Sequence, residues 1–366
     1  MKVAILIAGV LLVGTIAAAQ QSTEPVEALD GVDTVILLKE GKEVFGKQAF
    51  RSEHDRFAYL FSSAETKAEF DKAPEKYAIQ MGGLCARMGG TTTGNPSDYF
   101  VHENKIYVFG SDACHKAFAA APSKYLPKAA PPMPRDMASS ARGQILLDKA
   151  VASMGGAKLD TLTTYVEATA ETQPRPSGDV RIVTQSSWRF PGGARAERTM
   201  TMPNRPAVSY GTLLTPEGAW TFGGSRMMPV IPQALASVQQ DLGRQLVPLL
   251  RSRRSEGTRV AALGSATIDG TSVERVRVRR DGLDVTLNID PVNGRVHSST
   301  FVGRNREGEF GEYTLLYADY RDVSGVTVPF VEKALFNGSA DASRSRTLDS
   351  VTVNAAVDAT LFQRPR

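Results

Sequence analysis

Hydrophobic and polar positions alternate through much of the second half of the chain. In residues 180–190, Val180, Ile182, Trp188 and Phe190 lie an even number of positions apart, with charged and polar residues between them. Residues 285–290 and 326–330 repeat this period of two, which predicts strands that are buried on one face. Tight hairpin turns are predicted at pairs in which Asn or Asp precedes Gly, because these residues tolerate a positive φ: Asp269-Gly270, Asp281-Gly282, Asn293-Gly294 and Asn337-Gly338.

A helical period appears in two places among these strands. Leu147, Val151 and Met154 recur on one face of a predicted helix that ends at Gly155-Gly156. A second helix is predicted near residues 232–254, where the apolar residues of one side are Leu235, Val238, Leu242 and Leu246. The second half is therefore expected to be an antiparallel meander with an apolar face that two helices can cover.

The first half contains an internal repeat. Residues 59–63 (YLFSS), Phe70 and residues 73–77 (APEKY) form one copy, and residues 107–111 (YVFGS), Phe118 and residues 121–125 (APSKY) form the other. Each copy predicts a strand that leads into a short helix, with Ser63 and Ser111 as N-caps.

A proline-rich segment separates these two halves. Residues 127–140 contain four prolines and little that could pack, so they are interpreted as an interdomain linker. This interpretation places an N-terminal domain at residues 22–126 and a C-terminal domain at residues 141–366. The overall fold class predicted is α+β.

The first nineteen residues have the pattern of a secretory signal peptide. Lys2 precedes an uncharged apolar run from Val3 to Ile16, and residues 17–19 (AAA) offer a cleavage site after Ala19. The run is shorter than the roughly 20 residues that a membrane span needs. No Cys follows the site and no later stretch is apolar enough to span a membrane, so a periplasmic or secreted protein is expected.

Composition adds little to this picture. The formal net charge is only +4, so the pI near 9.0 is weak evidence for a nucleic-acid partner, and none is expected. Two arginine clusters, at residues 251–254 and 275–280, are interpreted as solvated faces. No nucleophile elbow, phosphate loop or zinc-protease helix occurs, and no enzyme activity is predicted.

Residues 26–126 resemble the secreted YHS-domain (TRASH-like) family. The resemblance lies in residues 28–33 (ALDGVD), 59–65 (YLFSSAE), 74–78 (PEKYA), 82–86 (GGLCA) and 106–118 (IYVFGSDACHKAF). It implies a small hairpin-and-helix fold with thiolate ligands for a soft or borderline metal ion such as zinc or copper. Cys85 and Cys114 match two of the family's three cysteines, Gly110 stands in place of the middle one, and Thr66 stands opposite Cys114 in the first copy. His115 and His102 are the candidates to complete the ligand set.

Three alternatives remain open for Cys85 and Cys114. An even pair in an oxidising compartment favours a disulfide, provided that the Cα atoms lie within about 7 Å. Metal ligation and free buried thiols are the other two alternatives, and two thiolates alone are too few for a tetrahedral site. The absence of a CxxC motif gives no support to a thioredoxin-type redox site.

Residues 142–365 resemble the LolA/LppX-like lipoprotein-carrier superfamily. The resemblance lies in residues 144–150 (QILLDKA), 218–220 (GAW) and 317–326 (YADYRDVSGV). It implies an incompletely closed antiparallel barrel with helices across its mouth and an apolar cavity for acyl chains. Trp188, Phe190, Trp220 and Phe222 are expected on one apolar strand face, which is either the wall of such a cavity or simply packed core.

These resemblances imply a periplasmic or secreted binding protein for lipid or another apolar ligand, with an appended YHS-type module. The alternative is an envelope protein that handles or senses metal through Cys85 and Cys114. An envelope protein is a candidate partner for either function.

Overall fold

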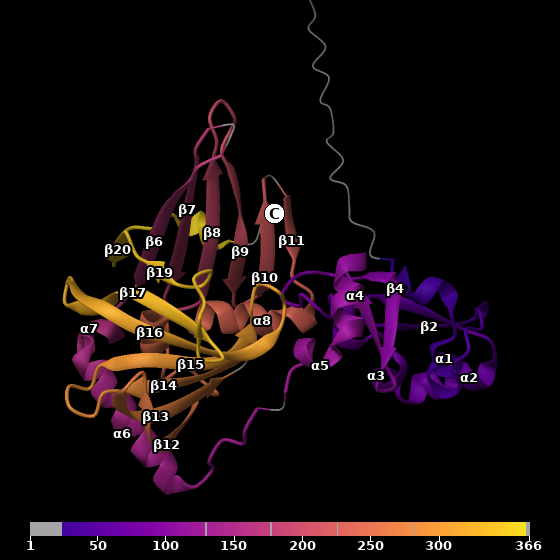
Figure 1. The fold of residues 1–366 in the computed structure, drawn as a ribbon, viewed down its shortest axis with the longest axis horizontal. Coiled ribbons are helices and arrows are strands. Elements are labelled where there is room, and N and C mark those ends of the chain that lie inside the picture. Colours follow the sequence, from indigo (N-terminus) through magenta and orange to yellow (C-terminus); the bar gives the residue numbers. More distant parts are fainter. Residues whose placement is uncertain (1–23, 129, 176–177, 225, 281, 364–366) are drawn as a thin grey trace, which may run out of the picture.

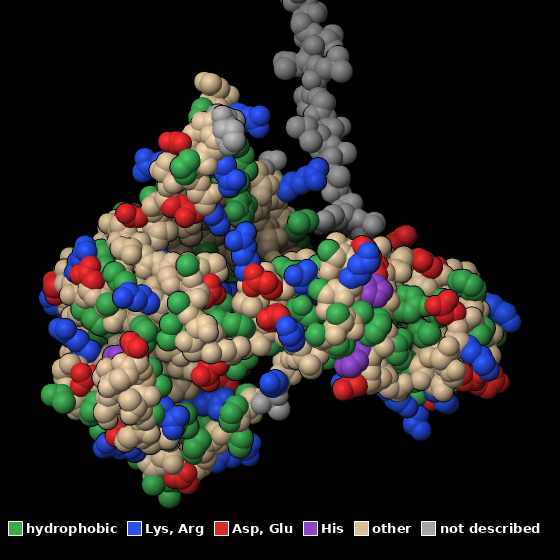
Figure 2. Space-filling model, viewed as in Figure 1, with side chains coloured by type: hydrophobic (Ala, Val, Ile, Leu, Met, Phe, Trp, Pro, Cys, Tyr) green, Lys and Arg blue, Asp and Glu red, His purple; other side chains and the backbone are tan. Residues whose placement is uncertain are grey.

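The computed structural model describes residues 24–363 except 129, 176–177, 225 and 281. The expected signal peptide, residues 1–19, lies outside the described residues. Figure 1 shows a smaller N-terminal part, and a larger part in which helices pack against two sheets. Figure 2 shows acidic and basic side chains interspersed over the displayed face of both parts.

The internal repeat is visible as two copies of one structural unit. Each copy consists of a hairpin, a helix of nine residues and a helix of four residues that begins with proline. The first copy is β2 (Lys47–His54), β3 (Phe57–Phe61), α2 (Ala64–Lys72) and α3 (Pro74–Tyr77). The second is β4 (Asn95–His102), β5 (Lys105–Phe109), α4 (Asp112–Ala120) and α5 (Pro122–Tyr125).

Both predicted N-caps are present in this unit. The Ser63 hydroxyl accepts a hydrogen bond from the Thr66 amide, and the Ser111 hydroxyl accepts one from the Cys114 amide, both at 3.3 Å. The N-terminal part also contains short elements before each hairpin. These are β1 (Val26–Glu27), η1 (Ala28–Gly31) and α1 (Thr34–Glu40) before the first, and η2 (Gln80–Gly83) before the second.

The second part begins with helix α6, which spans Met137–Ser153. The helix starts inside the proline-rich segment at residues 127–140, because the Asp136 carboxylate caps it by accepting a 2.7 Å hydrogen bond from the Ser139 amide. Gly143 lets α6 approach the sheet closely, since a Cβ at this position would lie 2.8 Å from the backbone of Ala261. The short helix α7 (Ala157–Asp160) follows.

Two antiparallel sheets make up most of the second part. The seven-stranded sheet has the order β11-β10-β9-β8-β7-β6-β20, and the eight-stranded sheet runs β12 to β18 in sequence order with β19 paired to β17. The bounds are β6 Thr164–Gln173, β7 Val180–Arg189, β8 Gly193–Thr201, β9 Val208–Thr215, β10 Gly218–Gly223, β11 Arg226–Pro229 and β20 Ser350–Val353. Those of the other sheet are β12 Arg259–Ile268, β13 Thr271–Arg280, β14 Leu283–Ile289, β15 Val296–Arg304, β16 Phe310–Val323, β17 Val326–Phe336, β18 Ser339–Ala340 and β19 Arg346–Thr347. The α+β class and the large antiparallel sheets are confirmed, and the described strands form two sheets without a closed barrel, in line with the expected incomplete closure.

The expected single helix at residues 232–254 is two helices, α8 (Pro232–Gly243) and α9 (Leu246–Arg251). Gln245 between them has an extended backbone, with φ −59° and ψ 130°. Pro248 accounts for the break, because proline in a continuous helix would clash with the carbonyl four residues earlier and could not donate its own hydrogen bond. Both helices contribute buried side chains to the core that lies against the two sheets.

A buried ionic network joins the two sheets. The guanidinium of Arg346 on β19 binds Glu167 of β6 at 2.6 Å and Glu332 of β17 at 2.7 Å. The Gln245 side chain accepts a further 2.7 Å hydrogen bond from Arg346. Burial raises the pKa of the Glu167 carboxyl, against the attraction of the guanidinium. Strands from distant parts of the sequence are thereby fixed to one another and to the link between α8 and α9.

Polar contacts connect the N-terminal part to the second part. The Arg87 side chain donates to the Glu307 carbonyl at 2.9 Å, and Gln233 of α8 donates to the Asp55 carboxylate at 2.7 Å. Lys124 forms a 3.0 Å ion pair with Glu309. In the described part of the chain, no helix has both the length and the hydrophobicity needed to cross a membrane.

Candidate functional site

An apolar pocket of about 340 Å³ lies between the seven-stranded sheet and helices α8 and α9. Its walls come from the ends of β7, β8 and β9, from both helices, and from Arg280 at the end of β13. The apolar side chains among its lining residues are Trp188, Phe190, Ala194, Leu214, Pro216, Leu242 and Pro248. A concave site of this size and lining is typical of small-molecule pockets.

The inner wall of this pocket is continuous with the main core. Trp188 is buried, its indole N–H donates to the Leu242 carbonyl at 3.2 Å, and its ring lies 5.5 Å from that of Tyr165. Phe190 is half-buried, and the Arg251 guanidinium lies 5.4 Å from the centre of its ring. Trp188 therefore has a fixed orientation, while Phe190 lies at the solvent-exposed edge of the pocket.

The four aromatic residues expected on one strand face lie on two opposite faces. The pairing register aligns Trp188 with Ala194, Ala194 with Leu214, and Leu214 with Ala219. Because successive side chains of a strand point to opposite faces, Trp220 projects away from the face that carries Trp188. Phe222, two positions further on, shares the face of Trp220.

This second face is filled by the chain itself. Trp220 packs with Leu213 and with Phe362 of η3 (Ala359–Phe362) in a small buried cluster. The Arg195 guanidinium covers the ring of Phe222 at 3.8 Å. Trp188 and Phe190 thus remain candidates for ligand binding, and the expectation that Trp220 and Phe222 join them in one site is wrong.

The predicted thiols lie in one apolar cluster of the N-terminal part. Cys85 is fully buried and Cys114 is 8% exposed, and both belong to the cluster that contains Phe109 and Phe118. Both are free thiols, so the expected Cys85–Cys114 disulfide is absent from this structure. Burial among aromatic rings satisfies the two side chains without a bond, since a thiol behaves as a small hydrophobic group.

The predicted histidines are occupied by other partners. His115 stacks on Phe109 at 4.7 Å between ring centres, and its Nδ1 pairs with the Asp98 carboxylate. His102 lies 3.7 Å from Glu103 and makes an edge contact with Phe118.

The structure brings no metal-ligand set together. Across the described residues, no three His, Cys, Asp or Glu side chains converge on a point where a metal ion could bind. The expected site made of Cys85, Cys114, His115 and His102 is therefore not formed. Two thiolates supply too few ligands for tetrahedral zinc, and the His115 ring is held by Asp98.

Sequence reasoning did not single out Asp33, the most connected polar residue of the N-terminal part. It is fully buried, and one carboxylate oxygen caps α1 by accepting from the amides of Val35 and Ile36 at 3.0 and 3.2 Å. The other oxygen accepts from the amide and hydroxyl of Ser62 and from the Thr66 hydroxyl, all at 2.8 Å. In the sequence, Asp33 and Thr34 before an apolar run predict only a helix N-cap. The bonds to Ser62 and Thr66 could not be predicted, because these residues are remote in sequence.

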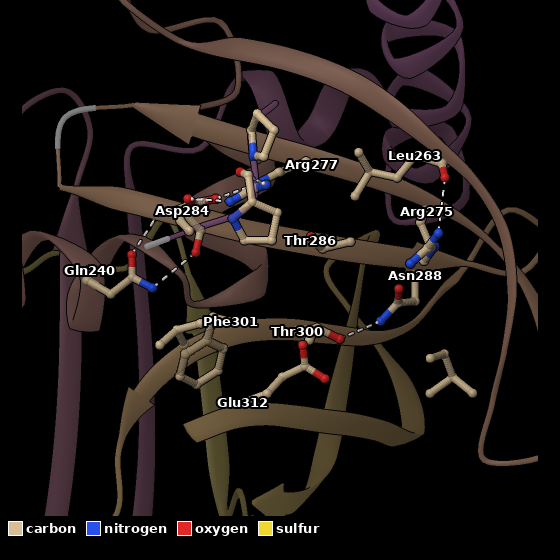
Figure 3. Close-up of a pocket in the computed structure, with 15 residues that line it drawn as sticks. Gln240, Leu263, Arg275, Arg277, Asp284, Thr286, Asn288, Thr300, Phe301 and Glu312 are labelled. Atoms are coloured by element: carbon tan, nitrogen blue, oxygen red, sulfur yellow. Dashed lines mark hydrogen bonds and ion pairs between the residues drawn. The ribbon is translucent and has the colours of Figure 1, made fainter. Parts of the chain in front are cut away.

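A second cavity, of about 550 Å³, lies along β13, β14 and β15 and has both apolar and charged lining residues (Figure 3). Two of its charged groups bind each other: the Arg277 guanidinium forms two hydrogen bonds of 2.7 and 2.8 Å to Asp284, whose backbone also binds the Gln240 amide. Asn288 donates to Thr300 at 3.0 Å, and its side-chain oxygen has no hydrogen-bond partner. The pocket at Trp188 differs in that two aromatic rings, those of Trp188 and Phe190, form part of its wall.

Comparisons with known proteins reveal only distant structural similarity. No protein-family model matches this chain, and a sequence comparison with curated proteins finds no match. A solved DUF1329 family protein from Desulfovibrio piger is 11% identical, with a TM-score of 0.39, and covers 60% of this chain and 97% of its own. A LolA superfamily protein from Nitrosomonas europaea is 14% identical, with a TM-score of 0.38, over 61% of this chain and 97% of its own. A lipoprotein-sorting domain from Vibrio parahaemolyticus is 12% identical, with a TM-score of 0.37, over the same shares.

Proposed function

We propose that this chain is an extracytoplasmic binding protein that holds the apolar part of a lipid or similar ligand in the pocket bordered by Trp188 and Phe190. The observation that carries the proposal is the pocket itself, whose inner wall is the main apolar core and whose outer border is the half-buried Phe190. Binding there would remove further apolar surface from water, which favours association. The extracytoplasmic location rests on the signal-peptide pattern of residues 1–19, and no catalytic role is assigned to any residue.

The N-terminal part is included in this proposal as an appended YHS-like module. The proposed units are residues 22–126 and residues 141–366, with residues 127–140 as the linker. Limited proteolysis of the full chain tests this division, because cleavage at an exposed linker should release two fragments that remain folded. Resistance of the segment before α6, together with one cooperative unfolding transition, would contradict it.

The pocket is tested with two matched phenylalanine variants of the full chain. Phe190 and Phe222 are both half-buried on the seven-stranded sheet, but only Phe190 lines the pocket. A glutamate at position 190 would place a charge against the apolar chain of the ligand, and burying an unpaired charge is costly. We expect Phe190→Glu to weaken binding of a fluorescent fatty-acid probe by about tenfold or more, a loss of roughly 1.4 kcal/mol.

Phe222→Glu is the control for this experiment. It introduces the same charge on the opposite face of the same sheet, so the probe should bind as it does to the unchanged protein. Equal loss in both variants, with both still folded by circular dichroism, or no probe binding to the unchanged protein, would contradict the proposed site.

A further inference from the structure

A basic hollow of about 510 Å³ lies next to the apolar pocket, where the start of α6 meets the turn between α9 and β12. Its lining residues contain four arginines and no acidic side chain. The arginines are Arg135, Arg253, Arg254 and Arg259, and the neutral polar residues are Ser140, Gln144, Ser255 and Thr258. Ser255 also lines the apolar pocket, so the turn at residues 252–258 borders both spaces.

The charge of this hollow is only partly compensated. Arg253 is buried and its two terminal nitrogens bind Asp160 at 2.6 and 3.1 Å. Arg254 is 69% exposed in its side chain and lies 3.7 Å from the same carboxylate. Arg135 and Arg259 are exposed and form no ion pair with any other described residue. Asp160, together with the more distant Asp148 at 4.0 Å from Arg253, thus offsets only part of the charge of the four arginines.

Like charges also meet across the strands beside this hollow. Arg259 of β12 is the direct cross-strand partner of Arg279 of β13, and two like charges placed opposite each other destabilise a sheet. Arg279 is compensated by Asp284 at 3.2 Å, which leaves Arg259 directed to solvent. A bound anion would relieve this repulsion.

Two polar atoms in the lining have no hydrogen-bond partner in the described structure. They are the Nε of Arg253, whose side chain is 3% exposed, and the hydroxyl oxygen of Thr258. The Asp148 carboxylate lies 4.0 Å from this Nε, which is within ion-pair range but beyond hydrogen-bond reach. A buried charged donor without a partner is costly, so an oxygen-rich group that reached into the hollow would be stabilised.

We infer that this hollow binds a phosphate-type anion, and that it receives the anionic head group of the ligand whose apolar chain occupies the neighbouring pocket. The second part of this inference rests on the proposed function, because Ser255 connects the two spaces. Arginine is suited to this role, since its planar fork donates paired hydrogen bonds to phosphate oxygens. The ligand class is thus an anionic amphiphile.

The test compares three probes on the full chain at fixed ionic strength: lysophosphatidate, monoacylglycerol with the same acyl chain, and inorganic phosphate. We expect lysophosphatidate to bind about tenfold or more tightly than monoacylglycerol, because charge-assisted hydrogen bonds add to the apolar contacts. The double variant R254Q/R259Q removes two exposed charges and should abolish this difference without changing the affinity for monoacylglycerol. The control R181Q/R205Q removes two exposed arginines that line none of these spaces and should preserve the difference.

Each outcome separates the two proposals. Phosphate that binds with the same sensitivity to R254Q/R259Q, and no tighter binding of the lipid, supports the anion site but makes free phosphate its ligand. Equal affinity for lysophosphatidate and monoacylglycerol, with no phosphate binding that depends on Arg254 and Arg259, overturns the inference and leaves the apolar pocket intact. Tight lysophosphatidate binding that Phe190→Glu does not weaken supports the anion site and contradicts the proposed function. No binding of any probe overturns both.

Discussion

The two repeat copies of the N-terminal part share a backbone frame but differ in the chemistry that the frame surrounds. The amide of Asp33 donates to the Val44 carbonyl at 2.8 Å, and the amide of Cys85 donates to the Thr92 carbonyl at 2.9 Å. In each copy a glycine at the start of the hairpin then donates to a glycine carbonyl before it, at 2.8 Å. Asp33 and Cys85 therefore occupy equivalent positions, one after η1 and the other after η2.

The residues around these two positions also correspond. Ser62 and Thr66 of the first copy, which bind the Asp33 carboxylate, have Gly110 and Cys114 as their counterparts in the second. A Cβ added at Gly110 would lie 3.8 Å from the Cβ of Cys85. One frame thus presents Asp, Ser and Thr as a closed hydrogen-bond network, and in the other copy it presents two thiols and a glycine. The backbone therefore fixes three side-chain positions while leaving their chemistry free.

The largest expected effect comes from completing the thiol set. Gly110→Cys would place a third sulfur beside Cys85, four residues before Cys114. The backbone at Gly110 has no positive φ, so it does not oppose a side chain. Three thiolates with water as the fourth ligand can hold zinc tetrahedrally. We expect the reduced variant to bind about one equivalent of zinc, as measured by metal analysis after gel filtration.

Ser62→Cys in the first copy is the matched control for this variant. Its sulfur would face Asp33 and Thr66 rather than two thiols, so no stoichiometric zinc is expected. Equal zinc contents of the Gly110→Cys variant and the unchanged protein would contradict the equivalence of the three positions.

The next effect concerns stability. Asp33→Ala would leave several donors of the closed network without an acceptor and would remove the cap of α1, at a cost of about 1–3 kcal/mol for each unsatisfied buried group. We expect the free energy of unfolding to fall by roughly 3–5 kcal/mol, since solvent can reach some of these donors. Cys85→Ala removes one buried apolar atom and should cost only about 1–2 kcal/mol. Denaturant unfolding measures the free energy of unfolding of both variants. Equal losses of this free energy would show that the two positions do not differ as described.

The sequence predicted what depends on short-range patterns. The period of two in residues 180–190 corresponds to strand β7. The internal repeat, YxFxS followed by Phe and a segment with proline, forms the two-copy unit. Ser63 and Ser111 are helix caps, as predicted. Helix α6 carries the predicted apolar residues Leu147 and Val151 in the core. These features are set by neighbours within a few residues.

What the sequence could not provide depends on pairing between distant residues. The separation of Trp188 from Trp220 onto opposite faces follows from the register of four strands, which no single strand reveals. The partners of Arg346 and of Asp33 lie far away in sequence. The basic hollow likewise combines the start of α6 with a turn more than a hundred residues later.

The central claim is that an acyl chain binds at the face of the seven-stranded sheet that carries Trp188. The two tryptophans of this chain test it most directly. Trp188 lines the pocket, and Trp220 is buried on the opposite face with Leu213 and Phe362. Single-tryptophan variants, Trp220→Phe and Trp188→Phe, are titrated with a fatty acid brominated along its chain, since bromine quenches an indole only at contact. The account predicts strong quenching of the fluorescence of Trp188 and little quenching of that of Trp220. Quenching of Trp220 alone, or of neither tryptophan at saturating ligand, would contradict it.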